Sequence, residues 1–462
     1  MKNWKKGLLA LAFTGVLVLT GCSTIKDVSN DQSGIVYNGG SVVSVGDHLF
    51  YANAFESGVT SFDTSSSSEY DNASRHAYLA RTNKAEYAGT EFENPTKVEK
   101  ISDKLVGYSN MYMFVCGDYI YYATPNIHKT SENKHIWTYV SIYRCRLNGK
   151  DNKELFTTTA YNSSTAQIRA LSYNNKDYLV IYDGANINIL TLGNKVTSKF
   201  VSDGVTSVAL PDEGEAWDGN IYFTTDRNST AGQSGNIVYK ASVTNGDKVK
   251  ICQENGLTIT FTGRVANNLF YTRKQNDISE TYKLDLEVQT GSFATAGRWF
   301  YALEIFDVEG VAEGNDLYNG YLFCATRSST TQVMYYNTFE ASQNVGYSAT
   351  VFVESAYADT VTVFRENFYY TTSDKMIKKN VVSGEEETIV SDMSIRSGYF
   401  GYDFKYVDGN ITRLNNIYFY ATRVYDKDAE DYDESAATDT KNYLYGVDAS
   451  GVETPKLISQ LI

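Results

Sequence analysis

The sequence is poor in the residues that carry most enzyme and metal chemistry. Its 462 residues include only four His and five Cys, with no C-x-x-C pair and no H-E-x-x-H motif. It also lacks the G-x-S-x-G motif of serine hydrolases, a Gly-rich phosphate loop and the S-x-D-x-G-x-T-W box of sialidases. Carboxylates are abundant, but a sequence alone does not pair two of them across a cleft. No motif therefore specifies a reaction.

Proline and helical periodicity are scarce as well. There are only 4 Pro, and no amphipathic helical period of useful length follows residue 21. Tyr is instead abundant, with 38 copies, and Tyr is typical of strands that have one end in water. These features predict an all-β fold.

Positive charge is also in short supply. The formal net charge is −14, and it becomes −17 once Lys2, Lys5 and Lys6 are removed with the N-terminal segment described next. Such an acidic chain is unsuited to binding nucleic acid or to direct attraction by anionic lipid. We therefore expect no nucleic-acid partner.

The sequence has one long apolar run, from Gly7 to Leu19, which follows the three lysines. It is too short to serve comfortably as a mature membrane-spanning helix. Residues 1–21 are therefore predicted to be a signal peptide and lie outside the fold.

The end of this run, Leu19-Thr20-Gly21-Cys22, resembles the lipobox of bacterial lipoproteins. The resemblance implies cleavage before Cys22 and a thioether-linked diacylglyceryl group on its sulfur, with fatty acids such as palmitate. It also implies a protein held at the bacterial cell membrane, facing the extracytoplasmic side. The alternative is an ordinary signal peptide with a chance Cys. Residues 22–40, rich in Ser, Asn, Asp and Gly, are predicted to be a tether.

A short phrase recurs through the rest of the chain: a polar turn followed by an apolar, Tyr-rich strand. The residues that precede the eight strands are Asp47, Asp118, Asp177, Asn220, Asn268, Gly320, Asn367 and Asn416. Their spacings are 71, 59, 43, 48, 52, 47 and 49 residues, and the shorter values match the roughly 40–50 residues of a propeller blade. Most of the turn residues tolerate positive φ, as two-residue hairpins require.

Each phrase has apolar segments before and after it, so each unit is expected to contain four antiparallel strands. Residues 41–462 are predicted to form a β-propeller of eight such blades, with seven as the alternative. The competing all-β interpretation is a sandwich or a pair of stacked barrels. Ile35-Val36-Tyr37 is expected to supply an outer strand that joins the last blade to the first.

After Cys22 four cysteines remain: Cys116, Cys145, Cys252 and Cys324. Cys116 and Cys145 fall in the first and third strands of one unit, which are not neighbours in a blade. We therefore predict buried thiols rather than disulfides.

Long insertions are expected between the second and third strands, at 53–76, 125–138, 226–235 and 424–441. In a propeller these loops emerge on one face, and long loops often carry function. Trp137 lies in the second insertion and is a candidate for stacking on a sugar ring. Neutral surface drift and core packing are the alternatives.

Two charged groups are further candidates. Arg227, Arg327 and Arg423 fall at the same offset in their strands and Arg273 two residues earlier, so they predict a site for carboxylate, sulfate or phosphate. The alternative is that these arginines pack their stems on Tyr at strand ends. The acidic run that contains Asp426, Asp428, Asp431 and Asp433 is a weak candidate for Ca²⁺ but lacks the EF-hand spacing. We expect a solvated loop and no cofactor.

The repeated N-x-I-Y-Y/F phrase resembles that of bacterial lipoproteins with Tyr-rich propeller domains, which are similar to the YWTD propeller of low-density lipoprotein receptors. The likeness covers residues 41–462. The YWTD tetrapeptide itself is absent, and Phe223-Thr224-Thr225-Asp226 is the nearest phrase. The resemblance implies a fold and leaves the ligand undefined.

The leading functional hypothesis is a binding or scaffold lipoprotein whose loop-rich face meets a protein, peptide or glycan. The alternative is an enzyme that acts on extracellular polysaccharide through carboxylates in the central funnel, about 5–9.5 Å apart. A third hypothesis is a sensor of small anions built on the four arginines.

Overall fold

The computed structural model describes most of the chain between Ile25 and Leu461. The described residues are 25–28, 34–37, 42–53, 78–83, 98–105, 113–129, 135–160, 165–211, 217–226, 235–253, 255–265, 268–276, 278–286, 297–299, 304–307, 320–326, 331–338, 350–357, 361–364, 367–372, 375–391, 394–395, 401–407, 410–424, 440–448 and 456–461. They contain strands, turns and bends, and no helix among them is long and apolar enough to cross a membrane. The all-β prediction is confirmed.

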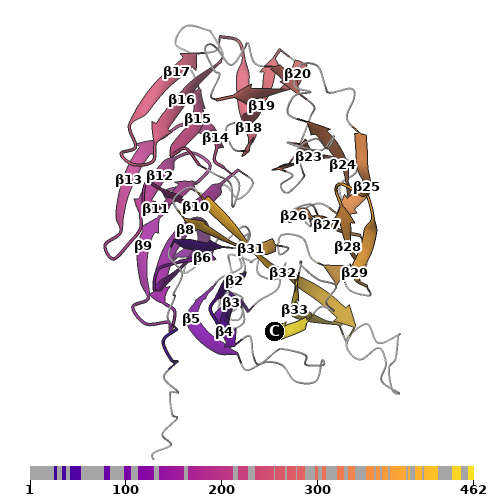
Figure 1. The fold of residues 1–462 in the computed structure, drawn as a ribbon. Coiled ribbons are helices and arrows are strands. Elements are labelled where there is room, and N and C mark those ends of the chain that lie inside the picture. The colour runs from indigo at the N-terminus through magenta and orange to yellow at the C-terminus, as the bar shows by residue number, and fades with distance from the viewer. Residues whose placement is uncertain are drawn as a thin grey trace, which may run out of the picture.

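The strands form small antiparallel sheets arranged in a ring, the architecture of a β-propeller (Figure 1). We number the repeats along the chain by their residues. The first four repeats comprise β2 (Val42–Val45), β3 (His48–Ala52), β4 (Tyr78–Asn83) and β5 (Glu99–Leu105); β6 (Met113–Cys116), β7 (Tyr119–Lys129), β8 (His135–Arg146) and β9 (Lys153–Thr157); β10 (Gln167–Tyr173), β11 (Lys176–Tyr182), β12 (Ile187–Thr191) and β13 (Thr197–Ser202); and β14 (Val205–Ala209), β15 (Asn220–Asp226), β16 (Asn236–Ser242) and β17 (Lys248–Gln253).

The remaining strands follow the same order. The last four repeats comprise β18 (Thr258–Val265), β19 (Asn268–Gln275), β20 (Ile278–Asp285) and β21 (Gly297–Trp299); β22 (Glu304–Asp307), β23 (Gly320–Thr326), β24 (Thr331–Thr338) and β25 (Thr350–Tyr357); β26 (Val361–Phe364), β27 (Asn367–Thr371), β28 (Met376–Asn380) and β29 (Glu386–Val390); and β30 (Ser394–Ile395), β31 (Gly401–Val407), β32 (Asn410–Val424), β33 (Thr440–Asp448) and β34 (Lys456–Leu461). One strand, β1 (Ile35–Tyr37), precedes them all.

The prediction of eight separate blades, with seven as the alternative, is wrong. The described strands form six separate four-stranded blades: the first, third, fourth, fifth, sixth and seventh repeats. The second and eighth repeats are fused into one ten-stranded sheet, because β1 pairs antiparallel with β6 on one side and with β31 on the other. The sequence hides this fusion because one three-residue strand connects segments far apart in the chain.

The position of β1 also differs from the expectation. It does join the N-terminal residues to the eighth repeat, but it pairs with first strands of repeats rather than outer ones, and with the second repeat rather than the first. As a result β31 reaches across the interior of the ring toward β1 and β10 (Figure 1). Both edges of β1 are thereby paired, which removes two open sheet edges.

The turns explain why the repeated phrase forms hairpins. Gly46 and Gly117 have φ of +52° and +57°, values that a residue without a Cβ adopts readily. In the third repeat the turn is Asn174-Asn175, with φ of +52° and +56°, so this copy is regular once it is aligned two residues earlier than Asp177.

The core lies between neighbouring repeats. In β3, Leu49, Phe50 and Tyr51 are all fully buried although they point to alternate faces, as predicted for strands covered on both sides. One apolar cluster links the first and second repeats, a second links the second to the fourth, and a third links the fourth and fifth.

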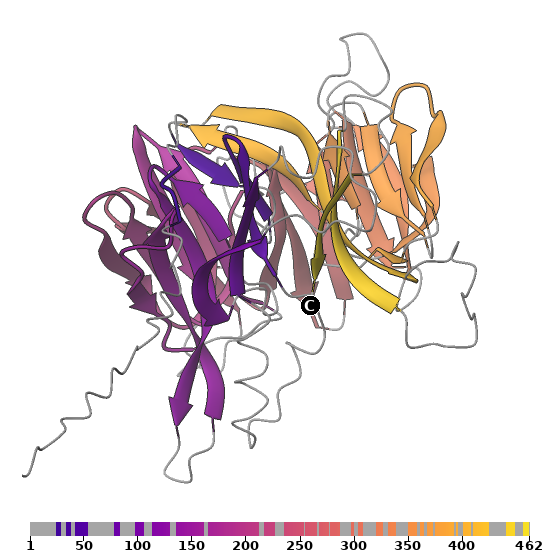
Figure 2. The same cartoon turned by 90° about the horizontal axis from the view of Figure 1, so that it is seen from below.

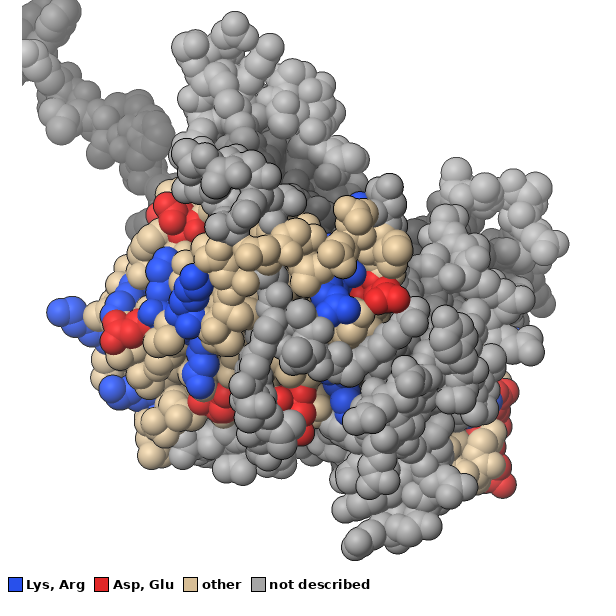
Figure 3. All heavy atoms as spheres, turned by 90° about the horizontal axis from the view of Figure 1, so that it is seen from above, with Lys and Arg blue, Asp and Glu red and all other residues tan. Residues whose placement is uncertain are grey.

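The outer edges are protected by charge. On β13 and β17 the exposed residues include Lys199, Lys248 and Lys250. Basic side chains gather on this side of the ring in Figure 3, which looks from the top of Figure 1. Lysines on an outer strand discourage pairing with another chain.

Candidate interaction surfaces

The second repeat carries a long two-stranded hairpin. Its register runs through Pro125↔Val140 and Asn126↔Tyr139 to Lys129↔His135, with an irregularity next to His128. Figure 2 shows this purple hairpin projecting from the body of the propeller. We call residues 125–140 the arm. The prediction of a structureless loop at 125–138 is therefore wrong over most of its length, because the antiparallel pairing of β7 with β8 continues through it.

Trp137 lies within β8, in the arm. Its backbone therefore belongs to a strand rather than to a loop, and its side chain lies outside the described residues. Its role in stacking on a sugar stays a prediction.

The other predicted insertions, at 53–76, 226–235 and 424–441, lie almost entirely outside the described residues, and only the strands that flank them are described. Gaps between second and third strands separate β3 from β4, β15 from β16, and β32 from β33. Connections of more than ten residues also join third to fourth strands, between β4 and β5, β20 and β21, and β24 and β25, and these were not predicted. Both ends of the ring thus carry long connections.

The arginine candidates are described only in part. Arg227 and Arg327 lie outside the described residues, and Arg423 belongs to β32, opposite Lys441, with its side chain outside them. Arg273 lies on β19 with its guanidinium carbon 3.9 Å from the centre of the Tyr282 ring, and it donates to the Tyr282 hydroxyl. That hydroxyl donates in turn to Glu280 at 2.6 Å. Arg273 therefore packs on Tyr, and the four-arginine site stays a prediction.

The acidic run with Asp426, Asp428, Asp431 and Asp433 lies outside the described residues, as does Cys22. Within the part of the chain that is described, no three His, Cys, Asp or Glu side chains converge as a metal site requires.

The two described thiols of the second repeat are buried, and neither forms a disulfide. This confirms the prediction for Cys116 and Cys145, because β7 separates their strands. Burial raises the pKa of Cys145 to about 12. Burial, and then the neighbouring Asp177 carboxylate, raises the pKa of Cys116, which donates to Asp177 at 3.2 Å. Both thiols are therefore unreactive at neutral pH.

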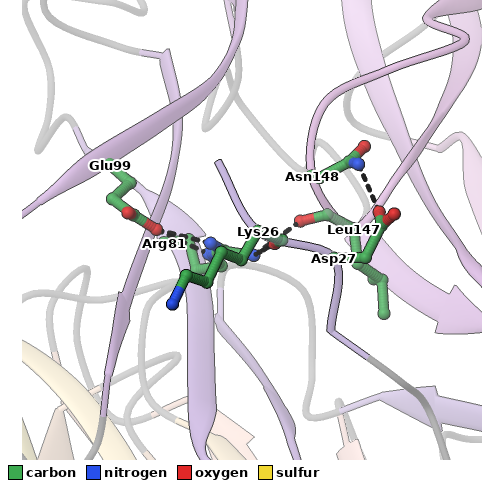
Figure 4. Close-up of polar contacts among 6 residues, drawn as sticks. All are labelled: Lys26, Asp27, Arg81, Glu99, Leu147 and Asn148. Carbon is green, nitrogen blue, oxygen red and sulfur yellow. Dashed lines mark hydrogen bonds and ion pairs between the residues drawn. The ribbon is translucent and has the colours of Figure 1, made fainter. Parts of the chain in front are cut away.

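The N-terminal segment forms a polar site that the sequence did not reveal. Residues Ile25–Val28, which we call the docked segment, lie between the first and second repeats (Figure 4). The Lys26 carbonyl accepts a hydrogen bond of 2.9 Å from Arg81 Nη1, and Asn148 Nδ2 donates to the Asp27 carboxylate. Ile25 and Val28 pack against the apolar cluster beneath. This part of the predicted tether is thus attached to the propeller.

Arg81 anchors this contact and is only 2% exposed. It makes an ion pair of 2.5 Å with Glu99 in its own repeat and donates to the Leu147 carbonyl of the next repeat at 3.2 Å. One guanidinium thus connects the docked segment with two repeats, which its planar set of five N–H donors allows.

The same device recurs in the second repeat. Arg81 lies opposite Phe50, and Arg144 occupies the same register opposite Tyr121. Arg144 donates to Gly193 O at 2.5 Å and to Asn194 O at 2.8 Å, both in the corresponding turn of the third repeat. Its guanidinium carbon also lies 4.1 Å from the centre of the Tyr119 ring.

A third buried arginine connects the fourth and fifth repeats. Arg264 donates to the Asn220 carbonyl at 2.9 Å and pairs with Asp218 at 2.8 Å. Burial alone would raise the pKa of Asp218, but Arg264 and hydrogen bonds from Asn220 outweigh it, so that pKa lies below its ordinary value. Arginines therefore connect neighbouring repeats at three described interfaces.

A sequence signal for these sites was present. Arg81 and Arg144 lie opposite the third residue of the second strand in their repeats, and this third-strand position is also basic at Lys240, Lys283 and Lys378. Burial lowers the pKa of Lys283 to about 8, against the opposing effect of Asp285. The sequence therefore carries a repeated basic residue at one position of the third strands.

No family model matches the chain, and no curated protein matches it. Among solved structures it is similar to the Dos1 propeller, with 9% identity, a TM-score of 0.44, and coverage of 84% of this chain and 92% of that one. The β-propeller domain of the Trilobed protease from Pyrococcus furiosus is 11% identical, with a TM-score of 0.32 and coverage of 77% and 97%. A Mycobacterium tuberculosis puromycin-hydrolyzing peptidase is 8% identical, with a TM-score of 0.39.

The match to that peptidase covers 86% of this chain but only 59% of the peptidase. It spans 53% of a Pyrococcus horikoshii acylaminoacyl peptidase and 54% of a prolyl endopeptidase. Likenesses this distant do not bear on function.

Proposed function

We propose that this chain is a lipid-anchored extracytoplasmic binding or scaffold protein. The propeller supplies a rigid body, the lipobox supplies an anchor at Cys22, and the arm-bearing end supplies the contact surface for a protein, peptide or glycan. No described residues favour the polysaccharide-acting alternative or the anion sensor over this function, and the YWTD-type resemblance adds no partner.

The observation that supports the contact surface is the arm. Past Ser141, β7 and β8 pair only with each other among the described strands, so the ribbon extends beyond the four-stranded part of its blade. Strands hold side chains more rigidly than loops do, so an arm pays less conformational entropy on binding than a loop of the same length. A ribbon of this kind suits recognition.

A screen of the unlipidated mature chain tests this surface. The protein should begin at Ser23, because a start at residue 41 would delete both the docked segment and β1. It is applied to glycan and cell-wall arrays, each hit is checked for turnover by mass spectrometry, and surface crosslinking seeks a protein partner. A cleaved hit would support the enzyme alternative instead.

A shortened-arm variant decides whether the arm is the contact. Replacing residues 126–139 by Asn-Gly between Pro125 and Val140 leaves the remaining β7–β8 pairs intact. We expect an unchanged unfolding transition and at least tenfold weaker binding of any hit. The matched control is Val249→Ser, which removes an exposed apolar side chain from the outer strand β17 of another repeat, away from the arm-bearing end. Equal binding by the shortened-arm variant and wild type would contradict the proposal.

The anchor is tested separately. Full-length protein produced in bacteria should partition into detergent and carry acyl chains on Cys22, and Cys22→Ala should abolish both properties. An unmodified Cys22 in the mature protein would refute the anchor and leave the arm experiment unaffected.

A further inference from the structure

We propose that the docked segment holds the propeller against the membrane by its rim between the first and second repeats. β20, which begins at Ile278 and lies across the ring from the first repeat (Figure 1), then lies away from the lipid. This inference rests on the lipid anchor at Cys22 proposed above, and it adds an orientation to it.

The first step is the length of the connection. Only Ser23 and Thr24 separate Cys22 from Ile25, so the two Cα atoms are at most about 11 Å apart even in a fully extended chain. A propeller of this length has a radius of gyration of about 22 Å. The connection is therefore short relative to the body, and the membrane must lie near the docked segment.

The second step is that the docked segment is fixed on both sides. The Lys26 carbonyl is held by Arg81 of the first repeat, and Asp27 is held by Asn148 of the second (Figure 4). Arg81 is fixed in turn by Glu99. Because Ile25 and Val28 also pack on the core cluster, the segment cannot swing freely as a flexible tether does.

The third step concerns charge. In the docked segment, β5, the end of β8, the β8–β9 turn and β9, the exposed charged residues comprise five cations and three anions: Lys26, Lys100, Arg146, Lys150, Lys153, Asp27, Asp151 and Glu154. The first turns of the same two repeats add the exposed Asp47 and Asp118. The outer part of this rim is thus more basic than the chain as a whole, whose formal net charge is −14.

A second basic edge lies on the third and fourth repeats, where Lys195, Lys199, Lys248 and Lys250 are exposed beside Asp203 and Asp247. Charge alone therefore does not choose between the two rims. The short connection between Cys22 and Ile25 selects the rim at the first and second repeats. Orientation by the connection and orientation by charge therefore predict that different rims contact the membrane.

The experiment uses the full lipidated chain in vesicles of phosphatidylethanolamine and phosphatidylglycerol. Flotation first shows whether the anchor exists: wild type floats and Cys22→Ala does not. Failure of wild type to float refutes the anchor, and with it this orientation.

Fluorophores at Lys150→Cys, Lys250→Cys and Ile278→Cys then report proximity to the membrane through quenching by a headgroup-nitroxide lipid. The parent chain without an added cysteine gives the background labelling. We expect quenching at position 150 to be several-fold stronger than at 250 or 278. Strongest quenching at position 250 would show that charge sets the orientation, and equal quenching at all three would show free tumbling; either result overturns the proposal.

A lengthened connection tests the cause. About twenty Gly and Ser residues inserted between Thr24 and Ile25 give a flexible reach of about 25 Å and leave the docked segment intact. This variant should still float, but the difference between positions 150 and 278 should disappear. Persistence of the full difference would mean that another contact orients the propeller, contrary to the proposal.

Discussion

Arg81 and Arg144 occupy the same position in neighbouring repeats, but their surroundings differ. Arg144 completes its contacts with the backbone of the third repeat and with tyrosines of its own. Arg81 uses a carboxylate, one carbonyl of the second repeat and one carbonyl of the docked segment. A device that joins repeats has thus been extended in one copy to hold the N-terminal segment.

The docked segment replaces an acceptor that the second interface obtains from its neighbouring repeat. Arg144 receives two carbonyls from one turn, whereas Arg81 receives one from the turn and one from Lys26. Because a buried guanidinium needs partners for its N–H groups, removing the docked segment leaves Arg81 short of one.

The largest effect should come from removing either arginine. Arg81→Met and Arg144→Met each leave buried acceptors without donors and should lower the free energy of unfolding by about 3 kcal/mol. Urea denaturation measures this, with Arg146→Met as control, because that residue is 44% exposed and pairs with an exposed Asp151. If only one of the two substitutions lowers the free energy of unfolding, the two arginine sites are not equivalent.

The two turns that accept these arginines should respond differently to a methyl group. A Cβ on Gly149 would lie 2.3 Å from the Ile101 carbonyl oxygen at a φ of +84°, whereas Gly193, with a φ of +133°, has nothing within 4 Å. Both substitutions to Ala incur backbone strain, and only Gly149→Ala adds a clash between repeats. We expect it to be less stable than Gly193→Ala by about 2 kcal/mol in denaturant unfolding. Equal losses would show that the close approach relaxes easily.

A smaller effect should follow from freeing the docked segment alone. Asp27→Ala removes the contact with Asn148 and should cost about 1 kcal/mol, together with faster proteolysis near residue 28. In a double-mutant cycle, Asp27→Ala and Asn148→Ala should show a coupling of about 0.5–1 kcal/mol. The exposed pair Asn245 and Asp247 provides the control, with coupling near zero. Additive losses at Asp27 and Asn148 would argue against docking.

The smallest effect should come from acidifying the ion pair of Arg264 with Asp218. Arg144, for which no ion pair occurs among the described residues, has no such dependence on pH. The lowered pKa of Asp218 means that its pairing with Arg264 is fully present above the unfolded pKa of about 3.9 and is lost as pH falls through the lower folded value. Below about pH 4, wild type should lose more stability than Asp218→Asn, by less than about 1 kcal/mol because Asp218 is partly exposed. Parallel pH profiles would contradict this.

The strands and turns of the repeats were predictable because they are local. Continuous apolar, Tyr-rich runs and Gly or Asn turns determine β3, β7 and their counterparts without help from distant residues. The number of blades was not predictable, since it depends on three residues, 35–37, pairing with residues near 115 and near 405. A strand of three residues is too short to show a clear hydrophobic pattern, and pairing between strands far apart in the chain leaves no pattern in the local sequence.

The candidate surface was predictable only in outline. The insertion at 125–138 correctly marked a place where the second repeat departs from the others, but the continuation of both strands into the arm depends on cross-strand pairing. The docked segment was missed because Ile25-Lys26-Asp27-Val28 offers only two apolar residues, within a stretch that is otherwise rich in Ser and Asn. Its order comes from Arg81 and Asn148, which the sequence places 55 and 121 residues away.

The pairing of β1 with β31 has a consequence for the order of events during synthesis. Ile35 pairs with Tyr406, so nearly the whole chain must emerge before that contact can form. Because the entropy of closing a loop grows only slowly with its length, the large separation in sequence delays this contact during synthesis but costs the folded protein little stability. A nascent or prematurely ended chain would expose the edge of β1 that pairs with β31, so completion of the last repeat is the step that seals the protein against aggregation.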